Sequence, residues 1–89
     1  MIEAAKSGNF PVVKFLQENG ANVNATTRDD TNSPLIHASR EGFFTIAKFL
    51  QENGANVNAK NVLRTTPIIA ASLNGHRDIV KLLQVHIIL

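Results

Sequence analysis

One stretch of twelve residues occurs twice in the chain without a change: KFLQENGANVNA stands at residues 14–25 and again at residues 48–59. The two copies are offset by 34 positions (48 − 14), whereas Pro34 and Pro67 are 33 positions apart. The period is therefore 33 residues, with one extra residue between Asn24 and Pro34. A period of about 20–50 residues is typical of proteins that stack equivalent units, whereas a catalytic site is normally built once.

The second half of each unit has the pattern of an amphipathic helix. Four apolar residues after Gly42 share one helical face: Ile46, Ala47, Phe49 and Leu50. The Asn53-Gly54 pair that follows could form a hairpin turn, but the preceding apolar residues recur at three and four positions rather than at two. We therefore expect Gly54 to end a helix, where its freedom to adopt positive φ is useful.

A shorter helix is expected in the first half of each unit. PLIHASREG begins at Pro34 and PIIAASLNG begins at Pro67, and a hydroxyl residue, Ser33 or Thr66, precedes each proline. A hydroxyl N-cap followed by proline at the first helical position is a common helix start. The segment IEAAKSG, from Ile2, is the same element without its start. Each unit thus consists of a short helix, a glycine turn, a longer helix, a glycine stop and an extended loop.

This pattern resembles the ankyrin repeat, through the stretches TTPIIAASLNGHRDIVKLL, SPLIHASREGFFTIAKFLQENGANVNA and AAKSGNFPVVKFLQENGANVNA. The resemblance covers Ile2 to about Leu83. It implies an all-α solenoid of three antiparallel helix pairs, joined by extended β-hairpin-like loops. The chain would then be a single ankyrin-repeat domain over residues 1–89, with units of about 1–24, 25–57 and 58–89, the first and last truncated.

The chain departs from the family pattern in its loops, where the usual glycine is missing. Arg64 stands at that position in the third unit, and a residue other than glycine adopts positive φ at a cost. In the second unit, Asn32 or Asp30 would tolerate this conformation best. We therefore expect both loops to be less regular than is usual in the family. His76 matches a family position and is expected to be structural.

Composition and spacing exclude several classes of function. The chain has no cysteine, and its three histidines, His37, His76 and His86, show no i, i+4 spacing for a metal. No arrangement of nucleophile, base and acid, and no phosphate-binding glycine loop, is legible. The net charge of +2 comes from dispersed basic residues, unlike a nucleic-acid-binding stripe. We expect a non-enzymatic protein without cofactor, metal, nucleic acid or membrane partner, in the cytoplasm or, alternatively, the nucleus.

The resemblance implies binding of a protein partner through the concave face, at positions that vary within the family. These positions are Lys6, Ser7, Arg28, Asp29, Asp30, Thr31, Arg40, Glu41, Asn61, Val62, Leu63, Arg64, Thr65, Leu73 and Asn74. Three of them, Val62, Leu63 and Leu73, are apolar without an expected role in stacking. Two interpretations are open. These residues form a patch that binds a partner, or they are the scattered exposed apolar residues that are normal on any protein.

The competing hypothesis is self-association. The segment VHIIL is uncharged and has high β-propensity, which favours association. It suggests a homodimer through the C-terminal end, at Val85, Ile87, Ile88 and Leu89. A third alternative is a truncated or engineered repeat scaffold with no natural ligand.

Overall fold

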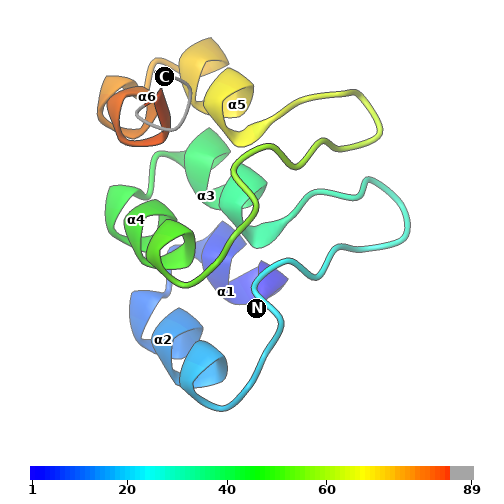
Figure 1. Ribbon diagram of the computed structural model, residues 1–89, viewed down its shortest axis with the longest axis vertical. Coiled ribbons are helices and arrows are strands. Elements are labelled where there is room, and N and C mark those ends of the chain that lie inside the picture. The colour runs from blue at the N-terminus through cyan, green and yellow to red at the C-terminus, as the bar shows by residue number, and fades with distance from the viewer. Residues whose placement is uncertain (85–89) are drawn as a thin grey trace.

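The computed structural model describes residues 1–84, and the helices within this range form a stack (Figure 1). In chain order they are α1 (Ile2–Ser7), α2 (Phe10–Glu18), α3 (Pro34–Glu41), α4 (Phe44–Glu52), α5 (Pro67–Leu73) and α6 (Arg77–Gln84). Residues 1–84 contain no strand. The predicted all-helical repeat fold is confirmed, whereas hairpin-like loops are not.

Each unit contributes one layer of two helices. α3 packs between α1 and α5, and α4 packs between α2 and α6, so the two sets of helices form parallel columns in Figure 1. The loop that follows α2 and the loop that follows α4 project to the same side of the stack, beside α3 and α5 (Figure 1). The α1, α3 and α5 column and the two loops together are called the concave face below.

The helices begin where the sequence indicates. Oγ of Ser33 accepts a hydrogen bond from the backbone N–H of Ile36 at 3.2 Å, and Oγ1 of Thr66 accepts one from that of Ile69 at 3.3 Å. These bonds satisfy N–H groups that have no partner within a helix. The long helix α4 ends before Asn53 and Gly54, which confirms a helix stop rather than a hairpin turn.

The core is centred on the middle layer, which has a neighbour on each side. Leu35, Ile36, Ile46 and Leu50 are all buried there. Small residues allow the helices of adjacent layers to approach, as at Ala5, Ala38, Ala47 and Ala71. Burial of this kind supplies about 25 cal/mol per Å² of apolar surface, and α3 packs both within its layer, on α4, and between layers, on α1 and α5.

In the second and third layers, an aromatic side chain packs over a glycine of the preceding layer. A Cβ atom on Gly8 would lie 2.8 Å from Cζ of Phe43, and one on Gly42 would lie 2.5 Å from Cε1 of His76. Phe43 and His76 occupy equivalent positions, 33 residues apart. Nε2 of His76 also donates a hydrogen bond to the carbonyl oxygen of Arg40 at 2.9 Å. The structural role expected for His76 is a contact between layers.

The two loops turn at equivalent positions, three residues before each helix-starting proline. Arg64 has φ of 64°, as its place at the missing glycine predicts, and Thr31 has φ of 56°. The expectation that Asn32 or Asp30 would take this conformation is wrong. The register of the repeat decides which residue turns, and the side chains of Asp30 and Asn32 are engaged in hydrogen bonds instead.

The predicted dimer contact falls outside the described part of the chain. Val85, Ile87, Ile88 and Leu89 all lie beyond residue 84. Association through this segment therefore stays a prediction.

Candidate functional site on the concave face

The predicted helical positions lie at the C-terminal ends of the three short helices. Lys6 and Ser7 are exposed at the end of α1, and Leu73 is exposed at the end of α5. At the end of α3, Arg40 is half-buried and Glu41 is exposed. Because α3 packs against both α1 and α5, stacking brings these helix ends onto one surface.

Most of the predicted loop positions are accessible. Five are exposed: Arg28, Asp29, Val62, Leu63 and Arg64. Three are half-buried: Asp30, Thr31 and Thr65. Asn74, which follows α5, is exposed as well. Contact of these side chains with a partner stays a prediction.

Asn61 differs from the other predicted positions because it is buried, with 7% of its surface exposed. Its Nδ2 donates to Oδ1 of Asn32 at 2.8 Å, and its Oδ1 accepts from the backbone N–H groups of Leu63 and Thr65, both at 2.9 Å. One side chain thereby fixes its own loop and links it to the loop of the previous unit. Asn61 supports the surface rather than offering a side chain to it.

Asp30 makes the second connection between the loops. Its carbonyl oxygen accepts a hydrogen bond from the backbone N–H of Val62 at 3.1 Å. Its carboxylate accepts from the backbone N–H of Asn32 at 3.0 Å and from Oγ1 of Thr27 at 2.7 Å. These two donors lower the pKa of Asp30 to about 2, so this loop carries a fixed negative charge at neutral pH.

His37 lies beneath this surface on α3 and is buried. Burial lowers its pKa below the ordinary value of 6.5, and the positive charge of Arg40 lowers it further. Asp30 acts in the opposite direction, as does Glu3, while Lys6 acts with Arg40. The imidazole is therefore uncharged at neutral pH and behaves as part of the packed layer.

Three apolar side chains of the third unit are the most distinctive exposed groups on the concave face. Leu63 is 80% exposed, Leu73 is 77% exposed and Val62 is 59% exposed. Leu63 and Val62 lie on the loop that Asn61 fixes, and Leu73 lies on α5. Large apolar groups held open to solvent on an ordered frame are suited to contact a partner.

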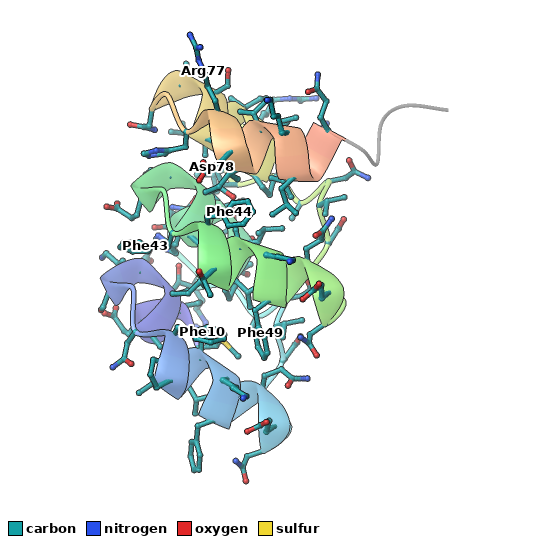
Figure 2. The ribbon with its side chains drawn as sticks, turned by 90° about the vertical axis from the view of Figure 1, so that its left-hand side faces the viewer. Phe10, Phe43, Phe44, Phe49, Arg77 and Asp78 are labelled. Atoms are coloured by element: carbon teal, nitrogen blue, oxygen red, sulfur yellow. The ribbon has the colours of Figure 1, made fainter. Side chains whose placement is uncertain are left out.

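Sequence reasoning did not anticipate an aromatic hollow on the opposite side of the molecule. The hollow is an open surface depression of about 410 Å³, lined by Gly8, Phe10, Phe43, Phe44, Thr45 and Ile46. Figure 2 views this side and shows the rings where α2 and α4 begin. The signal in the sequence was that phenylalanine recurs at two equivalent positions, Phe10 and Phe44, where α2 and α4 begin. Thr45 carries the only polar side chain among these lining residues, so the lining contains no carboxylate, imidazole or amine.

The described residues provide no obvious place for a metal ion. In residues 1–84, no three histidine, aspartate or glutamate side chains gather where they could bind one. None of the helices in this range has the length and hydropathy needed to cross a membrane.

A stack of equivalent helix pairs, with loops that project to one side, defines a helical repeat protein of the solenoid class. The family model for ankyrin repeats, in three copies, matches residues 1–87. The chain therefore belongs to the ankyrin repeat family, as the sequence motifs indicate. No curated protein matched the chain in a sequence comparison.

Proposed function

We propose that this chain is a non-enzymatic module that binds a partner protein through its concave face. Ankyrin repeats are generally protein–protein interaction modules, and the proposal assigns that role to a particular surface. The contact would be centred on the third unit, at Val62, Leu63 and Leu73.

The observation that carries the proposal is the combination of exposed apolar groups with a loop that is already fixed. Leu63 donates its backbone N–H to the buried Asn61, and Asn61 is bonded across to Asn32. A surface ordered before binding loses little conformational entropy on binding. Burying one leucine side chain contributes about 1.5–3 kcal/mol, so two such groups supply a large share of a moderate affinity.

The charges around these apolar groups are of both signs. Arg28 and Arg64 are exposed on the loops, and so are Asp29 and, at the end of α3, Glu41. Exposed ion pairs contribute about 0–1 kcal/mol each. We therefore assign affinity to the apolar groups and orientation to the charges.

The proposal is tested by affinity capture with the whole chain, followed by identification of the captured protein by mass spectrometry and titration of the purified pair. The variant Leu63→Glu/Leu73→Glu should lose at least about tenfold in affinity while its thermal unfolding is unchanged. Lys48→Gln, on the exposed side of α4, is the control and should bind normally. Undiminished binding by the double variant would refute the proposed surface.

A further inference from the structure

The first layer exposes apolar side chains whose counterparts in the second layer are covered. α2 and α4 share the sequence KFLQE, but Phe15 of α2 is 62% exposed, whereas Phe49 of α4 is partly buried against the core. One turn earlier, Val12 is 40% exposed and its counterpart Ile46 is 2% exposed. Identical local structure cannot cause this difference. It arises because α4 packs against α2, and no described residue packs on the far side of α2. Val12 and Phe15 form the α2 end face.

The third layer also exposes apolar side chains whose counterparts in the second layer are buried, but on the other end of the stack. Ile36 lies on α3, which packs against α5, and is completely buried, whereas its counterpart Ile69 is 42% exposed. Ala47 of α4 is likewise buried, whereas its counterpart Val80 of α6 is only partly buried. Ile69, Arg77 and Val80 form the α5–α6 end face.

The contact between the first two layers shows what fits an exposed phenylalanine of this kind. The ring of Phe49 meets the ring of Phe10 edge-on, with centroids 5.3 Å apart and an interplanar angle of 81°. The position of Phe10 is taken by Phe44 in the second layer and by Arg77 in the third. Arg77 is exposed, and an arginine guanidinium is attracted to the face of a phenylalanine ring. Figure 2 shows Phe10, Phe44 and Arg77 in successive layers at the starts of α2, α4 and α6.

We propose that copies of this chain associate head to tail, with the α2 end face of one copy packed on the α5–α6 end face of the next. Phe15 would then contact Arg77 of the second copy. Val12 would be covered as its counterpart Ile46 is, and Ile69 as its counterpart Ile36 is. By position in the repeat, the two end faces correspond to the two sides of the contact that joins layers within the chain. These two sides differ from each other, so the contact is heterologous. A heterologous contact that does not close into a ring leaves a free half at each end, so assemblies longer than a dimer form as concentration rises.

The first test is sedimentation of the full 89-residue chain over a range of concentrations up to about 1 mM, where weak contacts are populated. The weight-average mass should rise above 9.7 kDa. Phe15→Glu should weaken association at least about tenfold. Lys14→Gln is the matched control: it also lowers the net charge by one, and Lys14 and its counterpart Lys48 are both exposed. A chain that stays monomeric throughout would overturn the proposal.

A mixing experiment separates head-to-tail packing from a symmetric dimer. Phe15→Glu blocks one end face and Ile69→Glu blocks the other, so each variant alone should be monomeric. An equimolar mixture should form a one-to-one heterodimer, since each variant retains the half that the other lacks. The proposal fails if the mixture stays monomeric, or if Ile69→Glu alone still dimerises through α2. Circular dichroism and thermal unfolding verify that both variants are folded, as expected for substitutions at exposed sites.

Discussion

The ring of His76 lies so close to Gly42 that a Cβ atom on the glycine would be 2.5 Å from Cε1 of the imidazole. Gly42 has φ of 82°, and the ring's Nε2 donates to the carbonyl oxygen of Arg40 two residues earlier. This contact joins the second and third layers at the turn between α3 and α4. The contact requires the imidazole of His76, and it also requires that residue 42 has no side chain.

Gly42→Ala should therefore destabilise the chain more than Gly54→Ala does. Both glycines have positive φ, but a Cβ atom on Gly54 would meet nothing within 4 Å. The shared conformational cost is about 1–2 kcal/mol, and displacement of His76 should add about 1–3 kcal/mol to Gly42→Ala. Urea denaturation of the two variants measures the difference. Equal losses would show that the ring moves aside freely.

Asn61→Ala should lower the free energy of unfolding by about 2–3 kcal/mol, because it leaves the backbone N–H groups of Leu63 and Thr65 without their acceptor. Hydrogen exchange at these two amides should accelerate. Asn58→Ala, at an exposed position, is the control and should change stability by less than about 0.5 kcal/mol. If Asn61→Ala leaves both stability and exchange unchanged, the buried amide does not fix the loop.

Ser39→Ala is expected to stabilise the chain by up to about 1 kcal/mol. Ser39 is fully buried, and its hydroxyl has no hydrogen-bond partner among the described residues. Alanine removes the unsatisfied group and favours the helix. Ser72, the equivalent residue of the next layer, is exposed, so Ser72→Ala should have a smaller effect. A loss of stability in Ser39→Ala by thermal unfolding would mean that the hydroxyl has a favourable role.

Stability should fall as the pH drops below about 6.5, the ordinary pKa of histidine. The folded-state pKa of His37 is lowered by burial, so in this range the unfolded chain binds the proton more readily than the folded chain. The contribution is fully present above pH 6.5 and is lost as the pH falls towards the folded-state pKa. His37→Ala, which installs the residue found at the equivalent Ala70, should reduce this loss between about pH 7.5 and about pH 5. Parallel stability curves for the two proteins would contradict this assignment.

The stack of helix pairs was predictable because its signals are local and repeated. Ser33 and Thr66 form N-caps where their sequence context predicts them, and Arg64 adopts positive φ because it replaces a glycine of the repeat. Thr31 was not predicted to turn, because preferences of single residues favour Asp30 or Asn32 for this conformation. Position in the repeat outweighed those preferences.

The site was less predictable, because its supporting contacts join different units. Asn61 has the sequence context of an exposed loop tip, yet it is buried against Asn32, 29 positions earlier. The aromatic hollow likewise combines Phe10 with Phe43 and Phe44 across two layers. Neither contact is signalled by a pattern in the neighbouring sequence. The exposure of Leu63 and Leu73, by contrast, could be predicted, because neither residue has a role in stacking.

The most direct test of the central claim is the hydrogen-exchange footprint of the captured partner on this chain. We predict slower exchange in the loop segments 28–31 and 62–65 and at the C-terminal ends of α3 and α5, with no change at the starts of α2 and α4. Protection around Phe43 and Phe44, with residues 62–65 unaffected, would place the partner on the aromatic hollow and contradict binding through the concave face.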